Sequence, residues 1–231
     1  MLGLINSTIK SNLDRYFNSF LNSKSKNIEY QLQINALLST SKYIEQKMKN
    51  TSSFENKYEL LNEALKQAEN DGLFCEFGVY KGKTINYIAS KQKDIKIYGF
   101  DSFEGLPEFW RDGFAPGKFS NNGIIPTLLQ NVTIYKGWFN ETLPQFLDDH
   151  SEKVSFIHID CDLYSSTKTV LDLLEPRITK GTVIAFDEYF NYPFWSEHEY
   201  KAFQEYVLQN NIKYQYIGFN RYHEQVAVKV I

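Results

Sequence analysis

The sequence has little of what marks a membrane, secreted or nucleic-acid-binding protein. Its 231 residues include two cysteines, and its apolar runs stay far below the ~20 residues that cross a bilayer. The first residues lack the pattern of a secretory signal. A formal charge of −3 without a long basic run disfavours a nucleic-acid partner. Cys75 and Cys161 lie in apolar stretches, as reduced thiols do, so we expect a cytoplasmic protein with no membrane partner.

The apolar and aromatic content indicates a packed core. Hydrophobic residues make up 42% of the chain and aromatic residues 16%, which suits one α/β domain with a modest appendage. Residues 1–50 contain one glycine and no proline, so they predict one or two short helices. We expect this N-terminal helical extension to form a lid or an oligomer contact, with the main domain at residues 51–231. A homo-oligomer is the expected assembly.

Strand-like and helix-like segments alternate from Leu73 onward. The expected strands are Leu73–Phe77, Ile95–Phe100, Val132–Tyr135, Val154–Ile159, Thr182–Phe186, Lys213–Gly218 and Gln225–Val230. Alternation of this kind predicts a parallel sheet covered by helices on both faces. The short connection between the last two strands predicts an antiparallel pair. The sequence therefore predicts an α/β fold with a seven-stranded, mostly parallel sheet and an antiparallel last strand.

Two helix starts and one long loop complete this outline. Ser52 with Glu55, and Ser196 with Glu199, have the spacing of a capping box and predict a helix at each place. Between them, Ser102–Asn131 is rich in glycine and proline. A loop of that length inside a compact domain is usually a lid or a binding loop.

The residues that end the strands carry the chemistry, because open α/β sheets bind ligands at the carboxyl ends of their strands. Gly78 and Gly82 follow the first strand and allow a sharp turn close to a ligand. Their spacing does not match the Gly-x-Gly-x-x-Gly pattern of a dinucleotide site. Asp101 ends the second strand, where a carboxylate can accept both hydroxyls of a ribose. An aspartate that caps a helix or faces solvent is the alternative.

Three carboxylates, those of Asp160, Asp187 and Glu188, follow two later strands. Like charges brought together repel each other unless a cation lies between them, and oxygen ligands suit Mg²⁺. The sequence therefore favours a divalent-metal site. The alternative is that Asp160 contacts a cofactor while the other two are solvated.

Four motifs, in order, resemble those of the macrocin O-methyltransferase family of sugar-methylating class I methyltransferases. They are Glu76–Thr84, Gly99–Pro107, Lys136–Pro144 and Ile159–Thr169, within a match that runs from about Leu73 to Tyr189. The resemblance implies S-adenosylmethionine as methyl donor, a Mg²⁺ ion that holds two neighbouring acceptor oxygens, and a sugar or glycosylated metabolite as acceptor.

The resemblance also implies roles for individual residues. Glu76, Gly78, Tyr80 and Thr84, with the Gly82 turn, would line the methionine end of the cofactor. Asp101, Ser102 and Phe103 would hold the ribose and adenine side, and Gly137, Trp138 and Phe139 would close over the adenine. Asp160, Asp187 and Glu188 would be the metal ligands, with Asp160 also close to the methionine portion of the cofactor.

One departure from the family concerns the general base. Family members place a histidine after the second strand, but Ser102–Tyr135 contains none. Asp162, Tyr164 and His198 remain as candidates, and we favour Asp162 and His198 as catalytic residues. His198 is expected in the first turn of the helix that starts at Ser196, where the helix N-terminus would keep its ring neutral.

The acceptor-binding segment and the rival functions stay open. Phe109, Trp110 and Phe114, with Arg111 and Lys118, could stack on a sugar ring and contact an anionic group, or could simply pack as a surface loop or an oligomer contact. An NAD-dependent oxidoreductase is disfavoured by the missing glycine pattern. A non-catalytic binding module is disfavoured by the intact set of carboxylates.

Overall fold

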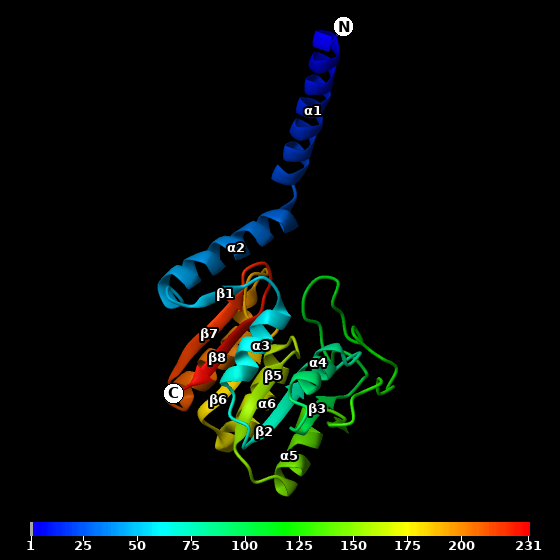
Figure 1. Ribbon diagram of the computed structural model, residues 1–231. Coiled ribbons are helices and arrows are strands. Elements are labelled where there is room, and N and C mark those ends of the chain that lie inside the picture. The colour runs from blue at the N-terminus through cyan, green and yellow to red at the C-terminus, as the bar shows by residue number, and fades with distance from the viewer. Residues whose placement is uncertain (1) are drawn as a thin grey trace.

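The computed structural model describes residues 2–231, with side chains from Ile9 onward. Within this part, eight strands form one sheet in the order β1-β7-β8-β6-β5-β2-β3-β4 (Figure 1). All neighbouring strands run parallel except β8, which is antiparallel to β6 and β7. The strands are β1 (Ser52–Phe54), β2 (Leu73–Phe77), β3 (Ile97–Asp101), β4 (Val132–Lys136), β5 (Val154–Ile159), β6 (Ile178–Phe186), β7 (Tyr214–Asn220) and β8 (Val226–Val230). The predicted mostly parallel sheet with an antiparallel last strand is confirmed, and β1 adds an edge strand.

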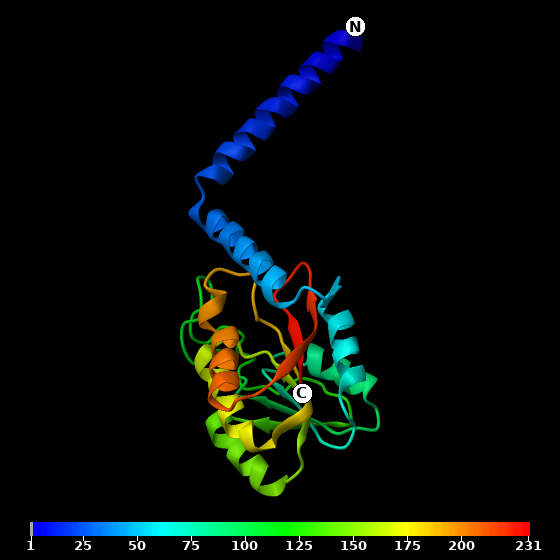
Figure 2. The same ribbon diagram turned by 90° about the vertical axis from the view of Figure 1, so that its left-hand side faces the viewer.

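Helices cover both faces of the sheet (Figure 2). On one face pack α3 (Lys57–Gln67) and α4 (Lys83–Lys91); on the other pack α5 (Phe139–Asp149), α6 (Tyr164–Leu174) and α7 (Glu199–Gln209). Successive strand residues point to opposite faces. Accordingly, Cys75 and Phe77 of β2 join the core under α5–α7, and Phe74 joins the core under α3 and α4. The central strands are buried on both faces, which explains their continuous apolar sequences.

Two N-terminal helices, α1 (Leu2–Ser25) and α2 (Ile28–Lys47), precede the domain. The prediction of helices here is confirmed, although both are longer than expected. Hydrogen bonds dock α2 on the segment after β6: Gln33 donates to the backbone oxygen of Asn191 at 2.8 Å, and the Trp195 ring donates to the Ser39 hydroxyl at 3.0 Å. In contrast, α1 points away from the domain (Figures 1 and 2). No helix in the described chain is long and apolar enough to cross a membrane.

The predicted capping box at Ser52 and Glu55 is wrong, because Ser52 lies in β1. The helix starts later, and Asn56 caps it: the side-chain oxygen of Asn56 accepts from the backbone N–H groups of Tyr58 and Glu59, both at 3.1 Å. The Glu59 carboxylate in turn accepts from the backbone N–H of Glu55 at 3.1 Å. The reciprocal cap therefore exists, four residues further along the chain.

The predicted helix start at Ser196 is also wrong. Ser196 lies in a 3₁₀ turn, Trp195–Glu197 (η2), and α7 begins at Glu199 with His198 as its N-cap residue. Glu199 does not cap this helix. It is fully buried, and one of its carboxylate oxygens accepts from the backbone N–H of Glu188 at 3.1 Å. A second 3₁₀ turn, Glu175–Arg177 (η1), follows α6.

The cap of α3 can be tested by substitution. Asn56→Ala should lower the free energy of unfolding by about 0.5–2 kcal/mol, because two backbone donors lose their acceptor. Asn56→Asp should keep most of the stability. Ser52→Ala, at the originally predicted cap, should leave urea denaturation unchanged. A larger loss for Ser52→Ala than for Asn56→Ala would contradict the assignment.

Candidate active site

The strand ends converge on one cavity at the carboxyl edge of the sheet. The chain runs outward from β2 to β3 and β4, and then returns to β5 beside β2. Ligands bind at such a switch point in open α/β sheets. Gly78 after β2, Asp101 at the end of β3, Asp160 after β5 and Asp187 after β6 all line a cavity of about 710 Å³, a usual size for a small-molecule site.

Most of the predicted cofactor residues line this cavity. Eight do so: Gly78, Tyr80, Thr84, Asp101, Ser102, Trp138, Phe139 and Asp160. Four do not belong to its wall: Glu76, Gly82, Phe103 and Gly137. The side chains of Glu76 and Phe103 are buried below it, and Gly82 caps α4 in a left-handed conformation. The four motifs therefore supply much of the cavity wall, and these four residues lie outside it.

Asp101 holds the loop that follows β2. One of its carboxylate oxygens accepts from the backbone N–H groups of Val79 and Tyr80, each at 2.7 Å, and the other accepts from Phe103 at 2.6 Å. Gly78 in this loop has φ +95°, and a Cβ there would lie 1.7 Å from the backbone oxygen of Asp160. Only glycine fits, because the loop passes directly over the next strand end.

Strained backbone occurs in three of the loops that follow strands at this edge of the sheet. Tyr80, Phe103 and Asp162 have φ between 48° and 64°, a left-handed conformation that costs a non-glycine residue on the order of 1 kcal/mol. Each lies two or three residues after the end of a different strand. Such strain clusters at functional sites, where the surrounding structure holds it in place.

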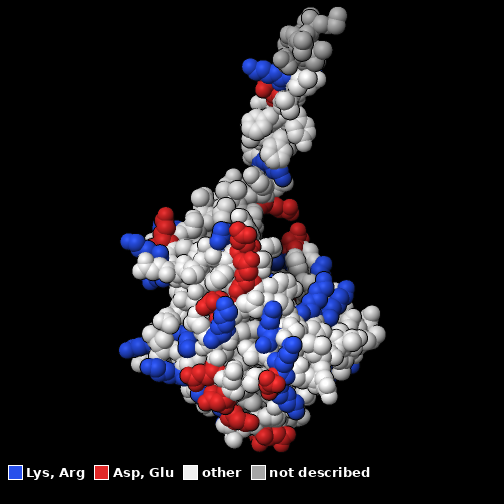
Figure 3. Space-filling view, viewed as in Figure 1, with Lys and Arg blue, Asp and Glu red and all other residues white. Residues whose placement is uncertain are grey.

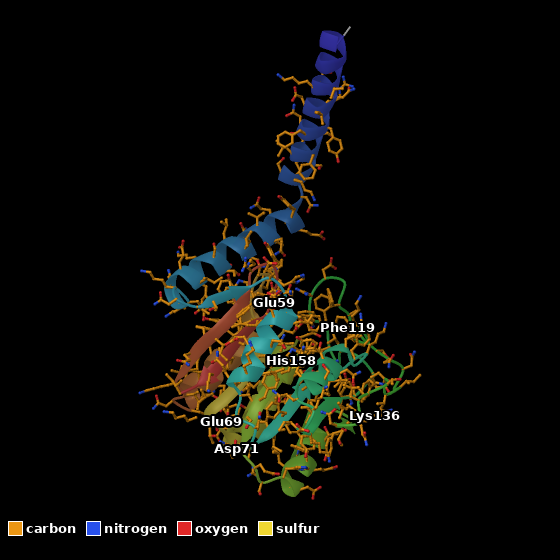
Figure 4. The ribbon with its side chains drawn as sticks, viewed as in Figure 1. Glu59, Glu69, Asp71, Phe119, Lys136 and His158 are labelled. Atoms are coloured by element: carbon orange, nitrogen blue, oxygen red, sulfur yellow. The ribbon has the colours of Figure 1, made fainter. Side chains whose placement is uncertain are left out.

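A buried network of charges lies beneath Asp187. His158, from the middle of β5, pairs in register with Glu76 of β2. Its Nδ1 is 3.2 Å from a Glu76 carboxylate oxygen, and its Nε2 is 3.6 Å from Asp187 Oδ1. Burial alone would lower the pKa of His158, but the contacts with Asp187 and Glu76 raise it to about 10. His158 thus lies between two carboxylates that favour its protonated form (Figure 4 labels its position).

Lys57, the first residue of α3, supplies a second cation. Its Nζ lies 3.3 Å from Asp187 Oδ1, and it lines the cavity. Although burial opposes it, the nearby charges of Asp187 and Asp160 raise the pKa of Lys57 above its ordinary value. In return, despite burial, His158 and Lys57 hold the pKa of Asp187 below its ordinary value. Asp187 is thus an anion between two cations.

The three predicted metal ligands only partly come together. Ligand atoms of Asp160, Asp187 and His158 lie within 4.8 Å of one another. Glu188 lines the same cavity but is outside this group. One of its carboxylate oxygens is buried without a hydrogen-bond partner. Burial, together with Asp162 and Asp187, raises the pKa of Glu188 well above its ordinary value.

The candidate bases have different surroundings. Asp162 is buried on the cavity wall, where burial and the Asp187 charge raise its pKa to about 7. His198 packs near the rings of Trp110 and Tyr192, does not line the cavity, and has a pKa lowered by burial and by Arg111. Tyr164 donates its hydroxyl to Glu205 at 2.6 Å.

The loop 102–131 lines the cavity with residues other than the predicted sugar-stacking set. Its lining members are Ser102, Gly105, Leu106, Pro107 and Phe119. Trp110 is buried instead, and the Arg111 guanidinium stacks on it at 3.9 Å while pairing with Glu224 at 3.3 Å. Phe109 is exposed. Trp110 and Arg111 therefore pack within the surface loop, as the alternative to sugar stacking expects.

Lys57 lies outside all four motifs and is brought into the site by helix packing. Ser165 and Ser166 lie within the motif Ile159–Thr169 but were given no role, and they line the cavity from the first turn of α6. His158 does carry a signal, since a histidine interrupts an otherwise apolar buried strand. Buried histidines require polar partners, and that requirement could have pointed to Glu76.

Comparison with known proteins adds an independent result. Residues 75–189 match the family described as a methyltransferase domain. The chain is 28% identical over 141 residues to the 8-demethyl-8-(2,3-dimethoxy-alpha-L-rhamnosyl)-tetracenomycin-C 4'-O-methyltransferase of Streptomyces olivaceus. The aligned segment covers 51% of this chain and 53% of that relative. The chain is also 26% identical over 145 residues to the demethyldecarbamoylnovobiocin O-methyltransferase of Streptomyces niveus, and this segment covers 53% of this chain and 54% of that relative. The chain spans about half the length of these curated relatives.

Solved structures share the fold. The calicheamicin methyltransferase CalS11 superposes with a TM-score of 0.57 at 22% identity, over 74% of this chain and 76% of that chain. The O-methyltransferase NovP gives 0.54 at 22% identity, over 74% and 79%. The sheet order and these structures show the class I methyltransferase fold, and residues 75–189 belong to the methyltransferase-domain family, with similarity to sugar O-methyltransferases of the macrocin type.

Proposed function

We propose that the protein transfers a methyl group from S-adenosylmethionine to a hydroxyl of a sugar or sugar-containing metabolite. The observation that carries the proposal is the division of the cavity at the strand ends into two halves. Asp101 and its glycine-containing loop lie on the β2–β3 side, and the carboxylates of Asp160 and Asp187 lie on the β5–β6 side. One half suits a nucleoside and the other suits an acceptor held by charge.

The cofactor half offers the groups that S-adenosylmethionine requires. Asp101 can accept one ribose hydroxyl, because its three backbone hydrogen bonds occupy all but one of the about four lone-pair positions of a carboxylate. Trp138 and Phe139 supply an apolar wall for the adenine, and Tyr80 and Thr84 adjoin the methionine end. The two buried thiols, Cys75 and Cys161, agree with a reducing, cytoplasmic location.

The acidic half fits a divalent cation. Asp160 and Asp187 present hard oxygen ligands at the ends of neighbouring strands. One buried oxygen of Glu188 has no hydrogen-bond partner, and a nearby cation would compensate for this. A bound ion would lower the pKa of an acceptor hydroxyl and orient it. Lys57 Nζ lies 3.3 Å from Asp187 Oδ1, so the lysine and an ion would compete for this carboxylate.

Asp162 is the base that the geometry favours. Asp162 lines the cavity next to the acidic half, in a left-handed backbone conformation. Methyl transfer is an in-line displacement, so the protein mainly aligns the two reactants and removes the hydroxyl proton. His198 remains the alternative, although it is outside the cavity wall.

The sugar acceptor rests on the relatives. One relative is named for a rhamnosyl group and another for a novobiocin precursor. In this chain, Leu106, Pro107 and Phe119 give the loop side of the cavity an apolar surface on which a sugar ring can pack.

Cofactor binding can be tested by calorimetry with S-adenosylhomocysteine. Asp101→Asn should weaken binding by about 1–3 kcal/mol, because one acceptor oxygen becomes a donor. Glu104→Gln, which changes a neighbouring carboxylate outside the cavity wall, should bind like the parent. Equal affinity of Asp101→Asn would remove Asp101 from the site, and tighter binding of NAD than of S-adenosylhomocysteine would favour the oxidoreductase alternative.

The metal site can be tested by titration with Mn²⁺. Asp187→Asn should weaken Mn²⁺ binding about tenfold or more while S-adenosylhomocysteine affinity stays the same, since Asp187 faces the acidic half. Lys57→Gln should tighten Mn²⁺ binding, because a competing charge is removed. Lys83→Gln, which changes another lysine of the cavity wall, is the control. If the parent protein binds no Mn²⁺ and chelator-treated protein keeps full turnover, the metal has no part in the reaction.

The base can be tested once transfer from labelled S-adenosylmethionine is detected on a panel of rhamnosyl glycosides. Asp162→Asn should lower kcat by about 10²–10⁴-fold with little change in cofactor affinity, since the amide cannot take the proton. His198→Gln should keep most of the activity. The reverse pattern, with His198→Gln inactive and Asp162→Asn active, would transfer the role to His198.

A further inference from the structure

From Ile9 onward, where its side chains are described, the apolar face of α1 is exposed. Six large residues along this helix are between 45% and 74% exposed: Ile9, Leu13, Tyr16, Phe17, Phe20 and Leu21. Figures 1 and 2 show that α1 joins the rest of the chain at the C-terminal end of the helix and points away from the domain. Figure 3 shows a largely uncharged surface along the middle of the described part of α1. Exposed apolar patches of this extent mark an interaction site.

The spacing of these residues is that of a helix-pairing seam. Ile9, Leu13, Tyr16 and Phe20 follow one another at intervals of four, three and four residues, so they form one stripe along the helix. Phe17 and Leu21 widen the stripe on one side. Asparagine and serine side chains occupy most of the opposite face.

This helix needs packing to be stable. Nearly half of its residues are glycine, serine, threonine or asparagine, which are weak helix formers. Most helical stability comes from packing of an amphipathic face rather than from propensity. Whereas α2 is held on the domain by Gln33 and Ser39, the link between α1 and the rest of the chain is local: Lys24 lies over the rings of Phe20 and Tyr30 at the corner between the two helices.

We propose that α1 pairs with α1 of a second copy of this chain, in antiparallel orientation. The four-three-four spacing reads the same in both directions. In an antiparallel pair, Ile9 therefore faces Phe20 of the second copy, and Leu13 faces Tyr16 of the second copy. Each contact occurs twice about a twofold axis, as in an isologous dimer interface.

The position of the domain favours the antiparallel orientation. Each domain is attached beyond the C-terminal end of α1 (Figure 1). A parallel pair would bring both domains to the same end of the helices, whereas an antiparallel pair places them at opposite ends. Neither α1 nor α2 contributes a residue to the described cavity wall, so this pairing leaves both cavities open.

The apolar face is large enough for a dimer. A helix of 24 residues is about 36 Å long. Half-exposed aromatic and aliphatic side chains of this size can bury about 100 Å² each. Six of them contribute about 600 Å² per copy and about 1,200 Å² in all, which is the lower limit of specific interfaces. We therefore expect a dimer that dissociates at micromolar concentration.

Sedimentation equilibrium of the full chain tests the pairing. The parent protein should be a dimer at tens of micromolar, and the double variant Leu13→Glu, Tyr16→Glu should be a monomer with unchanged S-adenosylhomocysteine affinity. The matched control Asn18→Glu, Asn22→Glu adds the same charge to the opposite face and should remain a dimer. A monomeric parent, or equal dissociation constants for the two double variants, overturns the proposal.

Disulfide cross-linking tests the orientation, since the native cysteines are buried. A mixture of Ile9→Cys and Phe20→Cys proteins should form a mixed disulfide, and neither variant alone should cross-link, because like positions lie about 16 Å apart along an antiparallel pair. Cross-linking of Ile9→Cys with itself would show a parallel pair. If the parent protein binds anionic lipid vesicles and does not self-associate, α1 contacts a membrane instead. If the Leu13→Glu, Tyr16→Glu variant has an altered cofactor affinity but the same molecular mass in solution as the parent, α1 acts as a lid instead.

Discussion

Compensation of buried negative charge is the constraint on which this site depends. Asp160 and Asp187 follow neighbouring parallel strands, so the fold itself brings the two carboxylates together. Buried like charges are costly unless cations accompany them. His158 supplies one from inside the sheet, and Lys57 supplies another from the first turn of α3. The position at which α3 begins therefore affects the chemistry as well as the stability of the domain.

The same sheet separates the two tasks of a transfer reaction. The loop after β2 and the end of β3 form a rigid half, held by the hydrogen bonds of Asp101, and the ends of β5 and β6 form a charged half. Because both halves are built on central strands, their relative position is fixed before any ligand binds. Alignment of two reactants is the main contribution that a protein can make to a displacement reaction.

Much of this arrangement could be predicted from the sequence, because strand ends carry local signals. The apolar runs ending at Phe77 and Ile159 locate β2 and β5 to the residue, and Asp101 and Asp187 follow from the neighbouring runs. The starts of the helices were located less accurately than the ends of the strands. Several polar residues near each start have the spacing of a capping box, and only the packing of the folded chain decides which of them caps the helix. Lys57 was missed because its approach to Asp187 depends on how a distant helix packs.

A crystal structure with S-adenosylhomocysteine and Mn²⁺, recorded at a wavelength where manganese scatters anomalously, tests the central claim most directly. We expect one ribose hydroxyl at Asp101 and one anomalous peak in contact with both Asp160 and Asp187, on the far side of the cofactor sulfur from the adenine. A nucleoside bound elsewhere, or an anomalous peak remote from these two carboxylates, would contradict it.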